Sequence, residues 1–414
     1  MIPLHYQENQ LLMDGVPVAE LAAAFGTPLY VYSEALLVAQ ARAFIAALPP
    51  GRDHLICFAV KANGNPHLLR RLFQAGLGAD VTSGGEYFLA RHADCPPQRI
   101  IYSGVGKTGP EIEAALAGGL RALHVESAQE LAVIAAIATA RQQVVPIGVR
   151  VNPDVAAETH PHISTGRGHH KFGVNPSLAR ELLHQVQQHP WLAPAGLATH
   201  IGSQITDLAP FAAAASTLVQ LATALAAEGI HLRYLDVGGG LGIDYTNETA
   251  APSPAGWLQT VATPITTAGY SLVVEPGRAI VAPAGVLLTQ VVYTKQQAEK
   301  QFVIVDAGMN DLLRPTLYQA HHPIWPARQA DDHPLTTVDV VGPVCETGDF
   351  LAQNRQLPLP RPGDLLAILH TGAYGFAMSS NYNGRLRPAE VLVSGQRYQL
   401  IRQRQTLAHL LDGT

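Results

Sequence analysis

A lysine, a run of glycines and a Glu/Arg pair follow short apolar runs, and together they suit the chemistry of one cofactor. Lys61 follows the apolar residues 56–60, where a partly desolvated lysine could bond covalently to a carbonyl carbon. The glycines at 238–240 leave backbone N–H groups accessible to a phosphate. Glu275 could hold a proton on a heteroaromatic nitrogen, and Arg278 could bind a carboxylate through two hydrogen bonds. This combination predicts pyridoxal phosphate as the cofactor.

Each of these residues also has a structural interpretation. Most lysines are solvated, and Glu275 and Arg278 could simply form an ion pair. His200 ends the apolar run 193–200; it is as readily a hydrogen-bonded core residue as a ring that stacks on a cofactor or transfers a proton. The grouping of these residues at strand ends favours the functional interpretation.

Two fragments resemble nucleotide-binding motifs, but both are incomplete. Gly106, Lys107 and Thr108 match the end of an ATP-binding loop, whereas Ile101 stands where the first glycine of that loop is required. Residues 240–242 give only part of a dinucleotide-binding fingerprint. The first fragment excludes ATP binding of this type, and the second is a weak signal.

Short β-rich runs alternate with amphipathic helical patterns through the middle of the chain. Helices are expected at 66–75, after a Ser127/Glu130 capping box, and after Asp207. Eight such repeats over about 225 residues predict a (β/α)₈ barrel, because an open dinucleotide-binding sheet usually has about six strands. The carboxyl ends of barrel strands carry the chemistry. The expected strands are 54–60, 78–81, 99–103, 121–125, 144–151, 193–200, 232–237 and 271–275.

After residue 278 the strands follow one another without long helices, which predicts an antiparallel β domain. We therefore expect a barrel at 33–278 and a β domain formed by residues 1–32 and 279–414. The expected strands of this domain are 279–293, 302–305, 336–341, 365–368 and 389–393.

Composition limits the class of protein. Of the 414 residues, 47% are hydrophobic and 14% charged, which excludes long disordered tracts. A net charge of −5 disfavours nucleic acid as a partner. Three cysteines indicate a reducing compartment, and we find no signal peptide or membrane-spanning segment, so a soluble cytoplasmic protein is expected.

Eight segments, in order along nearly the whole chain, carry a resemblance to a known family. The sequence resembles the diaminopimelate decarboxylases, which belong to the alanine racemase-like (fold type III) pyridoxal-phosphate enzymes. The segment with Cys345 and the downstream GAYG resemble the decarboxylase branch rather than the racemase branch. The matching segments are FAVKAN (58–63), DVTSGGE (80–86), HIGSQ (200–204), DVGGGLGID (236–244), EPGR (275–278), DAGMNDLLRPTLY (306–318), GPVCETGD (342–349) and GAYGFAMSSNYNGRLRPAEVL (372–392).

The resemblance implies a role for each matching residue and a homodimer with shared active sites. Lys61 would bind the cofactor covalently, His200 would stack on its ring, and Glu275 would pair with the ring nitrogen. Cys345 would enter from the partner subunit and donate a proton. The other cofactor-binding residues would be Asp80, Ser203, Gly238, Gly239, Gly240, Gly277, Arg278 and Tyr374. The substrate-binding residues would be Arg278, Arg314, Tyr318, Glu346 and Tyr374.

The implied reaction is decarboxylation of meso-2,6-diaminopimelate to L-lysine and CO₂, the last step of lysine biosynthesis. A decarboxylase for another basic amino acid, an amino-acid racemase, and a cofactor carrier without turnover are the alternatives. The loop at 167–170, within the sequence GRGHH (166–170), departs from the family pattern. The pairs His160/His162, His169/His170 and His321/His322 invite a metal interpretation. No acidic or cysteine ligand stands at a matching spacing, so no metal is expected.

Overall fold

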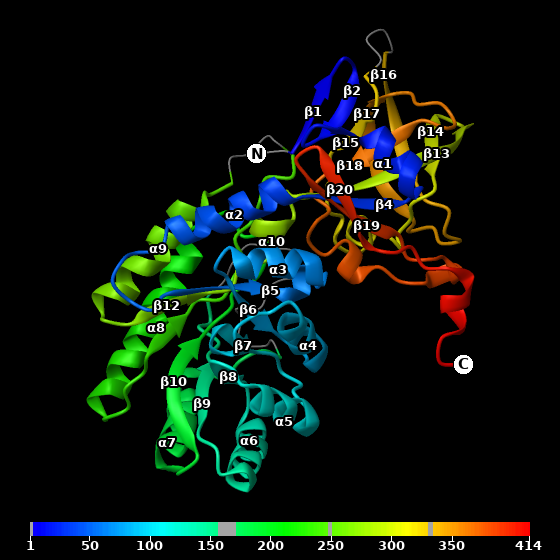
Figure 1. Ribbon diagram of the computed structural model, residues 1–414. Coiled ribbons are helices and arrows are strands. Elements are labelled where there is room, and N and C mark those ends of the chain that lie inside the picture. Colours follow the sequence, from blue (N-terminus) through cyan, green and yellow to red (C-terminus); the bar gives the residue numbers. More distant parts are fainter. Residues whose placement is uncertain (1–2, 156–170, 247–250, 330–333) are drawn as a thin grey trace. The chain divides into compact units, whose positions relative to one another are not determined.

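The chain forms two compact units in the computed structural model, which describes residues 3–155, 171–246, 251–329 and 334–414 (Figure 1). One unit consists of residues 41–243 and 251–279. The other contains the described parts of 1–40, 244–250 and 280–414. The departure at 166–170 and the histidine pairs at 160/162 and 169/170 lie outside the described residues.

The first unit is a closed barrel of eight parallel strands, so the barrel prediction is confirmed and the open-sheet alternative is wrong. Around the barrel the strand order is β10-β11-β12-β5-β6-β7-β8-β9. The strands differ from the expected runs by at most two residues at either end. Their bounds are β5 (Leu55–Ala59), β6 (Gly78–Val81), β7 (Ile100–Tyr102), β8 (Ala122–Val125), β9 (Val145–Arg150), β10 (Leu192–Ala198), β11 (Tyr234–Asp236) and β12 (Ser271–Val274).

Helices follow the strands, and small polar residues begin several of them. Ser83 and Ser127 each accept a hydrogen bond from the backbone N–H three residues later, as N-cap residues do. The carboxylate of Glu130 accepts a hydrogen bond from the N–H of Glu126, whereas the expected capping box requires the N–H of Ser127 as the donor. The helices are α3 (Pro66–Gln74), α4 (Gly84–His92), α5 (Gly109–Gly118), α6 (Ala128–Arg141), α7 (Pro176–Gln188), α8 (Ala209–Ala227) and α9 (Pro254–Thr267).

Helix α8 is by length and composition apolar enough to cross a membrane. In the structure it is one of the helices around the barrel, and it contacts α9 and β10. Its buried residues include Phe211, Leu218 and Leu225, which lie on one stripe of the helix.

Two glycines make room for large polar rings inside the barrel. A Cβ atom at Gly148 on β9 would lie 2.5 Å from Cδ2 of His124, and one at Gly196 on β10 would lie 2.5 Å from the ring of Tyr234. His124 and Tyr234 are each 1% exposed. The barrel interior is therefore shaped around these two side chains.

We expect Gly196→Ala to lower the free energy of unfolding by about 1–3 kcal/mol, because the added methyl group overpacks the interior against Tyr234. Chemical denaturation checks this result. Gly106→Ala is the control, since no atom lies within 4 Å of its would-be Cβ. Equal stability of the two variants would contradict the packing argument.

The second unit contains a mixed sheet rather than the antiparallel sheet that the sequence predicts. Its main path is β17-β16-β14-β13-β4-β19-β20, and β15 and β18 extend from β13. Most neighbours are antiparallel, but β4 pairs with β19 and β14 pairs with β16 in parallel. The main strands are β4 (Leu29–Ser33), β13 (Gly285–Gln297), β14 (Lys300–Val305), β15 (Ile324–Pro326), β16 (Leu335–Val341), β17 (Phe350–Pro358), β18 (Leu365–Ile368), β19 (Ala389–Ser394) and β20 (Arg397–Arg402).

The expected strand at 279–293 begins too early. A helical turn, α10 (Arg278–Val281), occupies its start, and Gly285 begins the strand proper. The first residues of the chain add a small sheet and two helices. These elements are β1 (Leu4–Gln7), β2 (Gln10–Met13), β3 (Val16–Pro17), α1 (Val18–Phe25) and α2 (Glu34–Ala46).

Candidate active site

Polar side chains from several strands gather at the carboxyl end of the barrel. Lys61 lies in the helical turn directly after β5, Asp80 lies in β6, and Asp236 is the last residue of β11. His200 follows β10 by two residues, and Glu275 follows β12 by one. Because all eight strands are parallel, these residues share one end of the barrel, which is where barrel enzymes carry their chemistry.

Lys61 forms an ion pair across two neighbouring strands. Its Nζ donates to Oδ2 of Asp80 at 2.8 Å, and Asp80 is completely buried. The lysine side chain is 36% exposed and is therefore partly desolvated. The amine is thus both held in place by a carboxylate and accessible from outside the barrel.

The glycine run packs tightly between its neighbouring loops. A Cβ atom at Gly239 would lie 2.1 Å from the carbonyl oxygen of Glu275, and one at Gly240 would lie 2.3 Å from that of Gly202. Gly238 and Gly240 also have positive φ angles, of 70° and 106°. These positions therefore need glycine for backbone reasons as well as for an open approach to the backbone N–H groups.

His200 is held by the same run. The N–H of Gly239 donates to Nδ1 of His200 at 3.2 Å, so this nitrogen must carry a lone pair. Desolvation holds the pKa of His200 well below its usual value, and nearby Arg150 and Lys61 act in the same direction. The residue is therefore a neutral ring of fixed orientation, which suits stacking on a flat cofactor.

Arg278 and Ser203 bridge the loops after β12 and β10. The guanidinium Nη2 donates to Oγ of Ser203 at 2.8 Å, and Arg278 is buried. Gly277 stands beside them, where a Cβ atom would lie 3.0 Å from that of Ala62. The bridge places a cation and a hydroxyl close to the glycine run, as binding of an anionic group requires.

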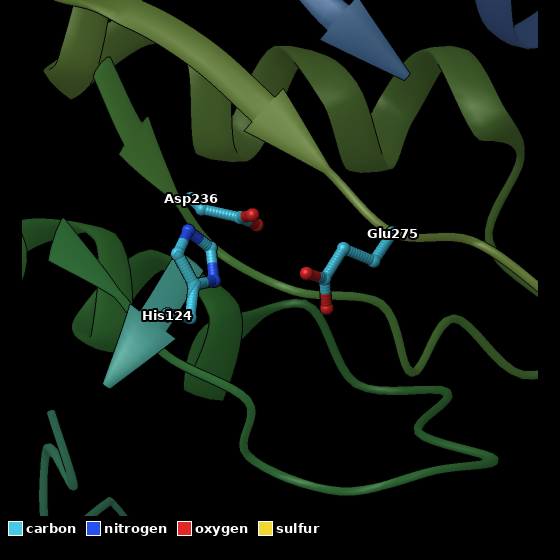
Figure 2. Close-up of side chains that lie close together, drawn as sticks. All are labelled: His124, Asp236 and Glu275. Carbon is cyan, nitrogen blue, oxygen red and sulfur yellow. The ribbon is translucent and has the colours of Figure 1, made fainter. Parts of the chain in front are cut away.

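Two of these carboxyls meet a histidine inside the barrel. His124 comes from β8, Asp236 from β11 and Glu275 from the end of β12 (Figure 2). Their nitrogen and oxygen atoms all lie within 4.8 Å of one another. Burial raises the pKa of Asp236 to about 7 and that of Glu275 well above its usual range, and each carboxyl acts on the other.

These residue types could also bind a metal ion, but the histidine is already engaged at both nitrogens. Nδ1 of His124 is 3.2 Å from Oγ of Ser103, and Nε2 is 2.8 Å from the hydroxyl of Tyr234. A neutral imidazole has one N–H and one lone pair, and both are used in this chain of hydrogen bonds. The arrangement fits a polar network better than a metal centre.

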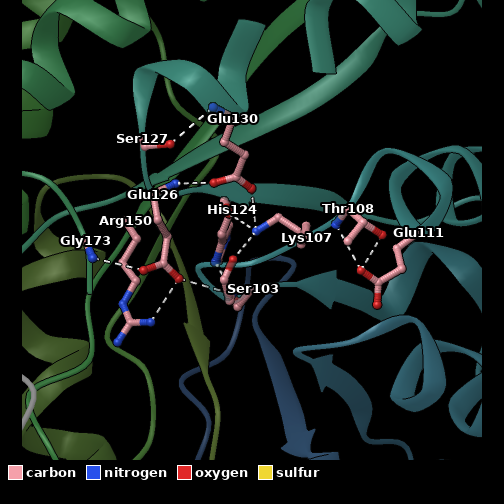
Figure 3. A network of polar contacts seen from close by, with 11 residues as sticks. Ser103, Lys107, Thr108, Glu111, His124, Glu126, Ser127, Glu130, Arg150 and Gly173 are labelled. Carbon is pink, nitrogen blue, oxygen red and sulfur yellow. Dashed lines mark hydrogen bonds and ion pairs between the residues drawn. The ribbon is translucent and has the colours of Figure 1, made fainter. Parts of the chain in front are cut away.

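A second network surrounds His124 and explains the incomplete ATP-binding motif (Figure 3). The side chain of Lys107 is fully buried and forms an ion pair with Glu130 at 2.7 Å. It also donates to the carbonyl oxygens of Gly104 and His124. Thr108 forms a capping box at the start of α5. The motif is therefore a structural element of the barrel.

Arg150 and Glu126 form the other half of this network. Nη1 of Arg150 is 3.1 Å from Oε1 of Glu126, whose carboxylate also accepts from the N–H groups of Gly104 and Gly173. Sequence reasoning missed Arg150, Glu126, His124 and the role of Asp236. The available signal was a polar residue that interrupts or ends an otherwise apolar strand.

In the second unit, Arg314 is buried in a defined hydrogen-bonded setting. Its Nη1 donates to Nε2 of His322 at 2.8 Å, and Nδ1 of His322 donates to the carbonyl oxygen of Leu369 at 2.7 Å. The ring of Tyr245 lies 4.9 Å from the guanidinium carbon. The adjacent histidine, His321, contacts Arg355 instead. The histidine pair therefore orients arginines.

The remaining predicted site residues also belong to the second unit. Cys345 is exposed rather than buried as a small apolar residue, and its N–H donates to Oδ1 of Asn383. The carboxylate of Glu346 accepts from the hydroxyl of Tyr382 at 3.2 Å. Tyr318 ends the helix α11 (Arg314–Tyr318), and Tyr374 has a φ angle of 55°, which is uncommon for an aromatic residue.

Comparisons with known proteins agree with this chemistry. Residues 34–282 match the family model described as "Pyridoxal-dependent decarboxylase, pyridoxal binding domain". The chain is 44% identical over 409 residues to a diaminopimelate decarboxylase of Aquifex aeolicus, covering 99% of this chain and 96% of that protein. It is 45% identical over 408 residues to a diaminopimelate decarboxylase of Pseudomonas aeruginosa, covering 99% and 97%.

Solved structures of diaminopimelate decarboxylases have the same fold. The diaminopimelate decarboxylase of Helicobacter pylori in complex with L-lysine superposes with a TM-score of 0.92 at 40% identity, covering 95% of this chain and 98% of that one. The diaminopimelate decarboxylase of M. jannaschii in complex with L-lysine superposes with a TM-score of 0.95 at 34% identity, covering 99% and 98%.

Proposed function

This chain belongs to the diaminopimelate decarboxylase family, and on that premise we propose how its residues carry out the reaction. The protein is a pyridoxal-phosphate-dependent carboxy-lyase that converts meso-2,6-diaminopimelate to L-lysine and CO₂. The single observation that carries the assignment of the site is the convergence of Lys61, the glycine run and Glu275 at one end of the barrel.

The barrel residues fit the cofactor group by group. The exposed amine of Lys61 suits covalent attachment, and the neutral ring of His200 suits stacking. The glycines at 238–240, with Ser203 and Arg278, suit the phosphate. The buried carboxyl of Glu275 suits the ring nitrogen. When bound, pyridoxal phosphate supplies an acceptor for the electrons left behind as CO₂ departs.

The protein's own groups position the substrate and control its protons. Asp80 holds the amine of Lys61, the group that would attach the cofactor, at the carboxyl end of the barrel. Arg278 and Arg314 bind the carboxylate at the distal end of the substrate, with Tyr318, Tyr374 and Glu346 around it. Gly277 lets its own chain segment pack closely against the carboxyl end of β5, where a Cβ atom would lie 3.1 Å from that of Ala59. This arrangement favours a dicarboxylic substrate over ornithine or lysine.

The protein acts as a cytoplasmic homodimer in this proposal, with Cys345 and Glu346 reaching the active site of the partner subunit. Cys345 then donates the proton that replaces the lost carboxyl group on the α-carbon. The support is the exposure of its thiol and its position in the matched segment 342–349. Cys57 and Cys95 are buried, and burial raises the pKa of Cys95 to about 12, which leaves both unsuited to this role.

A panel of substrates tests the proposal. We expect CO₂ release from meso-diaminopimelate, and much slower release from lysine and ornithine, which lack the distal carboxylate. Rapid decarboxylation of lysine or ornithine would assign another basic amino acid as the substrate. Loss of the optical activity of L-lysine or L-ornithine, or conversion of meso-diaminopimelate to another stereoisomer, without CO₂ release would assign a racemase instead.

We expect Arg314→Met to raise KM for diaminopimelate roughly 10- to 100-fold with a smaller change in kcat, because a charge-assisted hydrogen bond to the substrate is lost. Steady-state kinetics measures this effect. Arg355→Met is the matched control, since Arg355 is another arginine that contacts a histidine in the same unit. An equal rise in KM for both variants would remove Arg314 from the substrate site.

A further inference from the structure

The pair formed by Asp236 and Glu275 stands out because two carboxyls are buried together without an adequate countercharge. Asp236 is fully buried and Glu275 is 8% exposed. Oδ1 of Asp236 accepts from the N–H of Gly238 at 2.8 Å. Oδ2 is buried, and no N–H or hydroxyl group in the described part of the chain donates to it. A buried acceptor of this kind needs a donor, and a proton on Glu275 would provide one.

The neighbouring charges do not remove this need. Asp80 adds a third carboxyl to the surroundings, while Lys61 and Arg150 act in the opposite direction on Glu275. The nitrogen of Lys61 is already paired with Asp80, and Arg150 is paired with Glu126. Two buried carboxylates close together repel each other, so one retained proton lowers the energy of the pair.

His124 borders the pair without contributing charge. Burial lowers the pKa of His124 to about 3, so the ring is neutral at physiological pH. Its two nitrogens are held by Ser103 and Tyr234. Gly148 and Gly196 make room for these rings. The histidine is therefore a neutral, hydrogen-bonded ring that lies next to Asp236 (Figure 2).

We propose that Asp236 is a positioning residue that shares one proton with Glu275 and thereby makes that proton available to the ring nitrogen of the cofactor. On binding, the O–H bond of Glu275 breaks and an N–H bond forms with the lone pair of the nitrogen. A carboxylate facing a protonated nitrogen remains, and no proton is taken from water. The negative charge of Asp236 then keeps the proton on the nitrogen, because its loss would leave two buried anions without a cation.

Infrared spectroscopy of the cofactor-free protein tests the shared proton. We expect a difference spectrum of wild type minus Asp236→Asn, near neutral pH, to contain the C=O stretch of a protonated buried carboxyl. The spectrum of the Glu275→Gln protein should lack the same band, because this variant has no carboxyl group at position 275. Tyr234→Phe is the control and should retain it, since it removes a hydrogen bond but no charge. A band that persists in Asp236→Asn would place the proton on Glu275 alone and overturn the sharing.

Proton uptake on binding tests the second half of the proposal. The probe is 4-deoxypyridoxine 5-phosphate, which has the ring nitrogen and the phosphate but no aldehyde to react with Lys61. Calorimetry in buffers of different ionisation enthalpy counts the protons. We expect Asp236→Asn to take up about one more proton per chain than wild type. Equal counts would overturn the proposal, and Asp236→Ser carries the same test should the asparagine variant not fold.

The inference rests on the proposed placement of the cofactor at Glu275, but the two can fail separately. Absence of CO₂ release would contradict the proposed function and leave the infrared result standing. Normal CO₂ release with an unchanged infrared band in Asp236→Asn would contradict the inference alone.

Discussion

Replacing Lys61 with alanine is expected to lower kcat by on the order of 10⁴-fold and to abolish the visible absorbance of the lysine-bound cofactor. The reason is that Lys61 is the amine placed at the open end of the barrel, 2.8 Å from Asp80. The neighbouring lysine, Lys107, is fully buried and paired with Glu130, so it cannot take over. Absorbance spectra and CO₂ release measure the two effects.

Lys300→Ala is the control for this variant. Lys300 also pairs with an aspartate, at 2.8 Å, but it lies in the sheet of the second unit. We expect this control to retain the absorbance and the activity. A Lys61→Ala protein that keeps the visible absorbance would show that another amine holds the cofactor, and the assignment of Lys61 would then be wrong.

Cys345→Ala is expected to lower kcat by on the order of 10²-fold while the absorbance of the bound cofactor is unchanged, because loss of a general acid typically has this effect. Cys95→Ala is the control, since this cysteine is buried and serves no proposed role. Undiminished kcat in Cys345→Ala would assign the proton donor to another group.

Mixed dimers test whether the partner subunit supplies Cys345. Lys61→Ala and Cys345→Ala chains mixed in equal amounts should regain about a quarter of wild-type activity, since half of randomly paired dimers are mixed and each has one intact site. No recovery after subunit exchange would indicate that each active site is built from one chain.

Much of the barrel could be predicted from the sequence because its signals are local. Residues such as Lys61 and Glu275 come shortly after strands and directly follow apolar runs, and the cap Ser127 stands directly before the helix that it begins. The parallel pairing of β4 with β19 could not be predicted, because it joins residues at opposite ends of the chain. The early start of the expected strand at 279 reflects apolar residues that serve a buried helical turn equally well.

The contacts inside the barrel were less predictable than the residues at the ends of its strands. His124, Tyr234 and Ser103 meet only because the register of three strands around a closed barrel brings them together. Nothing in their own sequence neighbourhoods specifies these contacts. Gly148 and Gly196 are likewise explained by the rings that face them rather than by a turn. Long-range packing of this kind follows from the fold and not from any single segment.

The most direct test of the central claim is the stoichiometry of products from purified protein saturated with pyridoxal phosphate. With meso-diaminopimelate as the substrate, the account predicts equal amounts of CO₂ and L-lysine. Cofactor-loaded protein that releases no CO₂ from this substrate would contradict it.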